Sequence, residues 1–234
     1  LNTPITGGNV SLYNETEGRA IFPTPVLGVV GLLDDASKTA TRVFKTIGSA
    51  VVLLGDNLGE LGGSEYLATM HNLVAGKPPV IDLKREAALQ ALIVKLIRDG
   101  CVESAHDCSE GGLAITLAEC TFDSGGIGVS ADVTAVGDPL PDPSAVEGFS
   151  VNATLFGESA SRIVVSCASR HLDAVMTAAK AAEVSAREIG RVGGDSIRLS
   201  VNGQVAIDSK VAVAEQAWAT AIENKMRRKP RADS

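Results

Sequence analysis

Two apolar segments near the end of the chain are joined by Asn202-Gly203, a pair that favours a two-residue type I′ turn. Segments 197–201 and 205–207 therefore predict a β-hairpin with antiparallel strands. Upstream, amphipathic helical patterns alternate with short strand-like runs, which is typical of strands linked through helices. Because a hairpin and helix-linked strands coexist, the sequence predicts an α/β (α+β) domain built on a mixed sheet.

The remaining elements follow from hydrophobic spacing and from capping residues. Ser64 is placed to cap a helix and Gly100 to end one. We expect buried strands at 26–33 and 50–54, a short strand ending at Val102, and strands at 127–133, 162–166 and 184–192. We expect helices at 65–74, 84–98, 110–122, 145–155, 170–182 and 210–223.

Composition narrows the class of protein. Of the 234 residues, 45% are hydrophobic but only 3% aromatic, so Ala, Val, Leu and Ile must pack the core, as in many α/β enzymes. The net charge of −7 argues against a nucleic-acid partner, and the one basic run, 225–231, is typical of a solvated tail. No apolar stretch reaches the length of a membrane span. The cysteines at 101, 108, 120 and 167 form no Cys-x-x-Cys pair, which predicts reduced thiols in a cytoplasmic protein.

A glycine-rich polar loop, Thr6-Gly7-Gly8-Asn9-Val10-Ser11, lies at the start of the chain. Paired glycines let the backbone approach a bound group, because no Cβ stands in the way. Asn9 offers an amide oxygen of the kind that magnesium accepts, and Ser11 offers a hydroxyl. The loop suits a nucleotide-metal site, although Gly and Asn taken alone are more often turn residues. Because no Met precedes this loop, we expect the chain to be a piece of a longer protein.

The segment His106-Asp107-Cys108-Ser109-Glu110-Gly111-Gly112 precedes one expected helix. Asp107 or Ser109 is placed to cap that helix, and the N–H groups at a helix start also suit a phosphate. Glu110 in the first turn would itself complement the helix dipole and repel an anion. The spacing therefore favours capping and packing, and it leaves His106 open between a base and a core or loop histidine.

The segment Phe156-Gly157-Glu158-Ser159 precedes the strand expected from Arg162. We expect Glu158 and Arg162 to form an ion pair, which by itself says little about function. His71 and His171 have no partner pattern and are expected at the surface. No Ser-His-Asp arrangement or metal-ligand cluster can be argued from the spacing.

Taken together and in this order, the motifs resemble the synthetase subunits of phosphoribosylformylglycinamidine synthase, the PurL family. The resemblance covers essentially the whole chain and rests on residues 6–15, 23–31, 61–67, 106–114 and 155–159. The family shares an N-type and C-type domain pair with aminoimidazole ribonucleotide synthetase and contains that pair twice. The resemblance implies the tail of the second N-type (ATP-site) domain at 1–35, the second C-type domain at 36–224 and a basic, disordered tail at 225–234.

The resemblance also implies a reaction, in which formylglycinamide ribonucleotide, ammonia and ATP give formylglycinamidine ribonucleotide, ADP and phosphate in purine biosynthesis. Matching family positions assign ATP binding to Gly8, Mg²⁺ binding to Asn9 and binding of the ribonucleotide substrate to Ser11. The expected partners are a glutaminase subunit or domain that supplies ammonia and the remaining domains of the same synthase.

Other family parts have no counterpart here. The catalytic histidines and the acidic magnesium ligands lie in the first copy and in upstream sequence, so we expect no catalytic residue and no activity in this fragment alone. Glu158-Ser159-Ala160 differs from the substrate-binding Glu-Ser-Gln of the first copy, and no substrate role is transferred to it.

Two further interpretations stay open. The second C-type domain is a non-catalytic module in one of them, used for packing or for holding a structural nucleotide. In the other, the chain is a related ATP-using enzyme, such as selenophosphate synthetase or thiamine-monophosphate kinase. The Ser-Leu-Tyr-Asn-Glu extension at 11–15 argues for the synthase.

Overall fold

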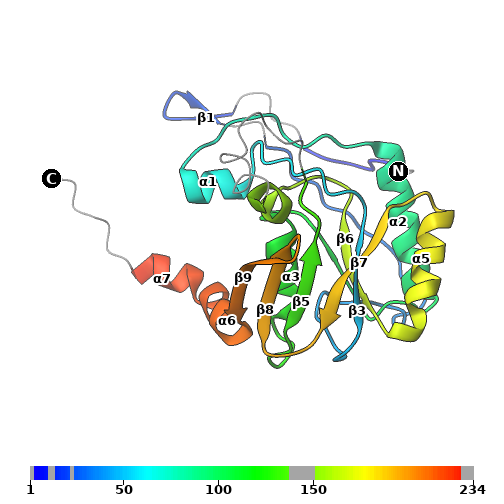
Figure 1. Ribbon diagram of the computed structural model, residues 1–234. Helices are drawn as coiled ribbons and strands as arrows, with labels where there is room; N and C mark the ends of the chain where they lie inside the picture. The colour runs from blue at the N-terminus through cyan, green and yellow to red at the C-terminus, as the bar shows by residue number, and fades with distance from the viewer. Residues whose placement is uncertain (1–2, 10–13, 22–23, 137–150, 228–234) are drawn as a thin grey trace. The chain divides into compact units, whose positions relative to one another are not determined.

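The computed structural model describes residues 3–9, 14–21, 24–136 and 151–227 (Figure 1). The chain divides into two compact units, Leu1–Ser37 and Lys38–Ser234. Within the range expected to hold a helix at 145–155, residues 151–156 are helical and residues 145–150 lie outside the described part. Of the segment 225–234, residues 225–227 are helical and the rest lies outside the described part.

The first unit contains a two-stranded antiparallel ribbon, β1 (Glu15–Thr16) and β2 (Arg19–Ala20). The buried strand predicted at 26–33 is wrong, because this segment forms no strand and its apolar side chains are exposed. Val30, for example, is 99% exposed. A strand needs a neighbour to accept its backbone hydrogen bonds, and the described residues give this segment none.

The second unit is built on a seven-stranded sheet with the order β4-β6-β3-β7-β5-β8-β9. Strands β5 and β8 run parallel, and the other neighbouring pairs run antiparallel. The predicted mixed sheet is therefore confirmed. The strands are β3 (Ala50–Leu54), β4 (Ser104–Asp107), β5 (Val129–Val133), β6 (Ile163–Cys167), β7 (Ala186–Val192), β8 (Ser196–Val201) and β9 (Gln204–Lys210).

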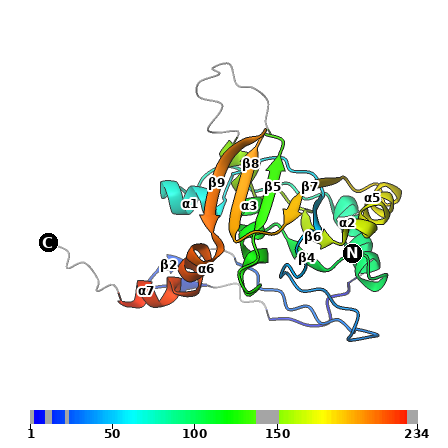
Figure 2. The same ribbon diagram turned by 60° about the horizontal axis from the view of Figure 1, so that its bottom comes forward.

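Strand β3 lies inside the sheet, between β6 and β7, and all five of its residues are buried. Because side chains alternate along a strand, β3 contributes to two separate clusters of core residues. Ala50, Val52 and Leu54 pack with residues of α2 and α5, whereas Val51 and Leu53 pack with residues of α3. The second unit is thus a sheet with helices on both faces, as Figures 1 and 2 show.

The helices agree with the predicted ranges to within a few residues. They are α1 (Glu65–His71), α2 (Leu83–Arg98), α3 (Gly112–Thr121), α5 (Leu172–Ala181), α6 (Val211–Ala219) and α7 (Ala221–Arg227). Ser64 caps α1 by accepting from Leu67 N, and α1 ends early at Asn72, which adopts a left-handed conformation. The single closing helix predicted at 210–223 is divided at Thr220.

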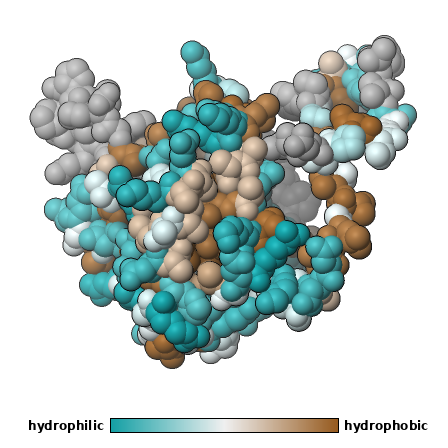
Figure 3. All heavy atoms as spheres, turned by 90° about the vertical axis from the view of Figure 1, so that its right-hand side faces the viewer, coloured by the Kyte–Doolittle hydropathy of each residue, from teal (hydrophilic) through white to brown (hydrophobic). Residues whose placement is uncertain are grey.

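In helix α2, the leucines that recur at helical spacing are the residues that pack against the sheet. Asp82 caps its start by accepting from two backbone N–H groups, and Leu89, Leu92 and Leu96 lie against the sheet. The outward side of α2 and α5 mixes charged residues with alanines, and Figure 3 shows a band of moderate hydropathy on this face. Gly100, as predicted, follows the end of the helix with a φ of 67°.

The hairpin between β8 and β9 is confirmed. Asn202 and Gly203 both have positive φ, 51° and 79°, as a type I′ turn requires, and Val201 pairs with Gln204. Strand β4, in contrast, begins two residues after the predicted end at Val102 and runs into the His106 motif. Its register is set by pairing with β6, which the local sequence does not encode.

All four cysteines are free thiols, as predicted, and only Cys101 is partly exposed. Burial raises the pKa of the Cys167 thiol to about 11. Among the described residues, every helix is too short or too polar to cross a bilayer.

Candidate functional site

The fold brings three of the sequence motifs to one edge of the sheet. Strands β3, β4 and β5 end at this edge and strands β6 and β7 begin there, because both are antiparallel to β3. The loops 55–64, 107–111 and 157–162 therefore meet, although they are far apart in the sequence. We call these three segments the motif loops.

Three glycines hold the motif loops together by direct backbone contact. A Cβ on Gly157 would lie 2.8 Å from Cα of Gly59, and a Cβ on Gly112 would lie 2.5 Å from the carbonyl oxygen of Gly157. Real Cβ atoms do not come so close, so any larger residue forces these backbones apart. Packing within the chain thus explains the glycines at positions 112 and 157.

The carboxylate of Glu158 joins two helix starts. Its Oε1 accepts hydrogen bonds from the backbone N–H of Glu65, at 2.9 Å, and from that of Gly111, at 2.8 Å. The prediction that Asp107 or Ser109 caps α3 is wrong, since the cap residue is Gly111 and no side chain of its own segment satisfies it. A carboxylate from a distant loop takes that place, and negative charge at a helix start is favourable.

Arg162 does not form the predicted ion pair with Glu158. Its guanidinium is buried, and it donates to the carbonyl oxygens of Gly157 and Ser159 at 2.6 and 2.9 Å and to Oδ1 of Asn57 at 3.1 Å. Burial lowers the pKa of Arg162, while the nearby Glu60 carboxylate opposes that shift. Each of the three guanidinium nitrogens donates to a neutral oxygen, so Arg162 ties loop 55–64 to loop 157–162.

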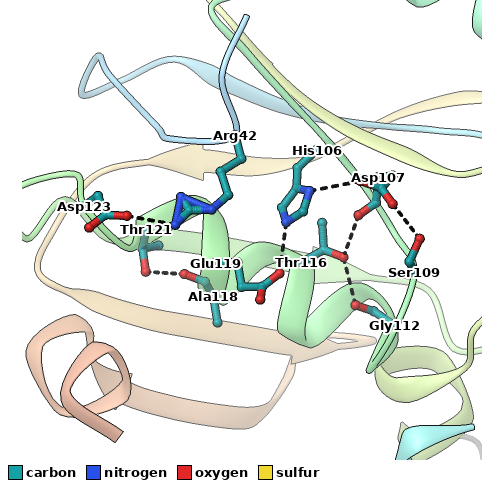
Figure 4. A network of polar contacts seen from close by, with 10 residues as sticks. All are labelled: Arg42, His106, Asp107, Ser109, Gly112, Thr116, Ala118, Glu119, Thr121 and Asp123. Atoms are coloured by element: carbon teal, nitrogen blue, oxygen red, sulfur yellow. Dashed lines mark hydrogen bonds and ion pairs between the residues drawn. The ribbon is translucent and has the colours of Figure 1, made fainter. Parts of the chain in front are cut away.

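His106 lies in a network of polar contacts beside α3 (Figure 4). Its Nε2 is 2.9 Å from a carboxylate oxygen of Glu119, and its Nδ1 is 3.3 Å from Oδ1 of Asp107. Ser109 donates to the other oxygen of Asp107, and this bond lowers the pKa of Asp107. The serine hydroxyl is thus directed at the carboxylate and not at the imidazole, and the network connects β4 to α3.

Sequence reasoning did not single out Asn57 as a member of this site. Its side chain accepts from Arg162 and donates to the carbonyl of Thr154, so it links loop 55–64 to the segment before Gly157. The available signal was its place directly after the buried strand β3, where polar side chains gather at a sheet edge.

The motif loops also border a cavity of about 460 Å³. Asp107, Glu110 and Glu158 contribute carboxylates to its wall, and Arg162 contributes a positive charge, each nitrogen of which already donates to a protein oxygen. The wall is therefore mainly negative, which does not favour the phosphates of a nucleotide.

The residues predicted to bind ATP and metal belong to the first unit. Gly8 and Asn9 are exposed, and Ser11 lies outside the described residues. Over residues 3–9, 14–21, 24–136 and 151–227, no group of three or more His, Cys, Asp and Glu side chains is arranged to hold a metal ion.

Comparison with known proteins places most of the chain in one family. Residues 46–202 match the family "AIR synthase related protein, C-terminal domain". The chain is 45% identical, over 95% of its length, to the phosphoribosylformylglycinamidine synthase subunit PurL of Moorella thermoacetica, and 41% identical, over 97%, to that of Anaeromyxobacter sp.. It spans only 28% and 29% of these two relatives.

Among solved structures, the chain is similar to Thermotoga maritima PurL complexed with FGAR, with a TM-score of 0.62 and 19% identity over 77% of this chain and 30% of that one. A second structure of the T. maritima protein gives a TM-score of 0.60 at 17% identity, over 77% of this chain and 28% of that one. At such identities the likeness supports the fold alone.

Proposed function

The chain belongs to the AIR synthase related family, and we propose that it forms the C-terminal portion of an ATP-dependent phosphoribosylformylglycinamidine synthase subunit. The observation that carries this proposal is the 45% identity to a PurL subunit over 95% of the chain. The longer protein would join ammonia to formylglycinamide ribonucleotide with hydrolysis of ATP to ADP and phosphate. This is a ligase reaction of purine biosynthesis.

The opening loop is the part of this chain that we assign to ATP. Neither Gly7 nor Gly8 has a positive φ, and a Cβ on either would meet nothing within 4 Å. Neither backbone strain nor packing within the described residues therefore requires glycine here, in contrast to the motif loops. Close approach of a bound phosphate is a reason for glycine that remains, and it supports a role for Gly8 in binding ATP.

Asn9 would supply one oxygen to a magnesium ion held on ATP. Asn9 is exposed, and its amide oxygen is a hard ligand that suits this ion. The ion would neutralise phosphate charge during phosphoryl transfer. Asn9 would fix the ion relative to the loop, and Ser11 would bind the ribonucleotide substrate.

The solved structures of T. maritima PurL include complexes with ADP, ATP, AMPPCP and FGAR. A further structure from this organism is of PurLQS. By analogy with these complexes, the longer protein would bind ATP and the ribonucleotide and would assemble with further subunits. We expect a glutaminase that supplies ammonia to be one of them. The expected compartment is the cytoplasm.

Two observations favour a structural role for the second unit. The Glu158 carboxylate is bonded to two backbone N–H groups, and residue 160 is Ala, which has no side-chain group for hydrogen bonding to a substrate. The motif loops are thus engaged with one another. We assign catalysis to other domains of the synthase and packing to this C-type domain.

The test compares two substitutions at one position in the longer protein. Asn9→Ala and Asn9→Gly both remove the amide oxygen, but glycine retains the conformational freedom of a turn. If Asn9 binds magnesium, both variants lose activity steeply and need more magnesium. Near-normal activity and magnesium dependence in Asn9→Gly would show that Asn9 is only a turn residue.

Two further measurements bear on the same proposal. Ser11→Ala should weaken use of the ribonucleotide by about 1 kcal/mol, the contribution of one neutral hydrogen bond. The 234-residue chain alone should form no formylglycinamidine product from ammonia, ATP, magnesium and the ribonucleotide. Turnover well above background by the purified chain would contradict the assignment of catalysis to other domains.

A further inference from the structure

The last helix of the second unit exposes an apolar face. Ile222 and Met226 lie four residues apart in α7, hence on one side of the helix, and they are 76% and 81% exposed. No residue of the described helix α7 is buried, and Figures 1 and 2 show it leading away from the sheet. We call α7, Ala221–Arg227, the arm.

The arm is also basic at its end. Lys225 and Arg227 lie in its last turn, Arg227 in an ion pair with Glu223, and the sequence continues with Arg228, Lys229 and Arg231. Residues 225–234 carry a net charge of +4, whereas residues 1–224 carry −11. An apolar face beside a run of positive charge requires a partner surface that is apolar and negative.

Such a surface exists on the same unit, between α1 and α3. A groove of about 330 Å³ has mainly apolar walls, to which Tyr66, Met70, Ile115 and Phe156 contribute. Tyr66 and Phe156 stack against each other with ring centroids 5.0 Å apart. Met70 is 67% exposed and Ile115 is 40% exposed.

The rim of this groove is acidic. Glu65, Glu110 and Glu119 line it, and the first two are exposed. Glu119 is partly buried and contacts His106, so it adds charge with less freedom to move. Apolar side chains surrounded by three carboxylates complement the apolar face and basic end of the arm in both respects.

We propose that the arm of one copy of this chain docks into the groove of a second copy. Ile222 and Met226 cover Met70 and Ile115, and Lys225 and Arg227 lie beside the glutamates of the rim. Both surfaces are present on every copy, so the contact needs no other protein. The rest of the chain is strongly acidic, which makes a second copy an electrostatically suitable partner for the basic end.

The test is sedimentation velocity of the full 234-residue chain over a micromolar concentration series. The arm variant carries Ile222→Asp and Met226→Asp, and the groove variant carries Met70→Asp. Ile47→Asp is the matched control, because Ile47 is 70% exposed and lies outside both surfaces. Circular dichroism checks that each variant folds, which the exposure of every substituted residue favours.

We expect the average mass of the unmodified chain and of the control to rise with concentration. The arm variant and the groove variant should each associate at least about tenfold more weakly. A mixture of the two variants should recover association, because it contains one intact arm and one intact groove. Added salt should weaken the contact by screening its charged part.

Several outcomes would overturn the proposal. One is an unmodified chain that is monomeric at every concentration, as expected if another part of a longer protein covers the groove. Association that survives both variants would place the contact elsewhere. Binding to anionic phospholipid vesicles that needs the arm but not the groove, without self-association, would identify a lipid surface as the occupant.

Discussion

Residues 26–33 and residues 50–54 have similar apolar sequences, yet only the second segment forms a buried strand. Both are runs of Val, Leu and other small apolar residues, and both predict a buried strand. The second is strand β3, and each of its residues is at most 5% exposed. The first forms no strand, and Val26, Val30 and Leu32 are more than 90% exposed.

The difference lies in the partners and not in the residues. Strand β3 has β6 on one side and β7 on the other, and helices cover both of its faces. Residues 26–33 belong to the first unit, whose only described strands are the two-residue β1 and β2. A β-forming sequence is therefore not sufficient for a buried strand, because the strand also needs neighbouring strands and covering helices.

The test with the largest expected effect shortens one leucine to alanine in each segment. Leu54→Ala should lower the free energy of unfolding by about 2–5 kcal/mol, because Leu54 is fully buried and leaves a cavity. Leu32→Ala should change it by less than about 0.5 kcal/mol, because Leu32 is 91% exposed. Urea denaturation of both variants measures this. Equal losses would show that residues 26–33 are buried in solution.

A second test compares glycines of the two units. Gly157→Ala should destabilise the chain by about 1–3 kcal/mol, since the new Cβ would lie 2.5 Å from the carbonyl oxygen of Ala153. Gly8→Ala should leave stability nearly unchanged, because nothing lies within 4 Å of its Cβ position. Thermal unfolding of the two variants decides the matter. A stable Gly157→Ala protein would mean that the motif loops are less tightly joined than the distances require.

A third test uses alkaline pH. All four thiols lie in the second unit, so their ionisation affects the stability of that unit. Folding raises the pKa of Cys167 from its ordinary value near 9 to about 11. Its contribution to stability is thus fully present below pH 9 and is lost as the pH rises toward 11, because the unfolded thiol ionises first. Denaturation at several alkaline pH values should show this fall, with a shallower slope in Cys167→Ala. An identical slope would exclude Cys167 as its source.

The smallest test concerns the two hairpin turns. Glu17 and Gly18 adopt φ values of 52° and 73°, close to those of Asn202 and Gly203. Because Asn tolerates this left-handed conformation better than Glu, Glu17→Asn should stabilise the β1–β2 ribbon by a few tenths of a kcal/mol. Slower amide exchange within residues 15–20 would show it. Unchanged exchange would mean that the turn does not limit this ribbon.

The sequence by itself determined the elements whose signals are local. The Asn202-Gly203 turn, the Ser64 cap, the buried stripe of α2 and the buried strand β3 all follow from neighbouring residues, and the structure contains each of them. The family, too, could be identified from motifs in their order along the chain.

Only the tertiary structure decided how distant segments satisfy one another. Glu158 accepts from backbone N–H groups at two helix starts, 93 and 47 residues earlier, and Arg162 bonds to Asn57 across 105 positions. Local reasoning assigned the cap to Asp107 or Ser109 and paired Glu158 with Arg162, since it could see only near neighbours. Hydrogen-bond partners and burial depend on which backbones the sheet brings together, and that information is absent from any single segment.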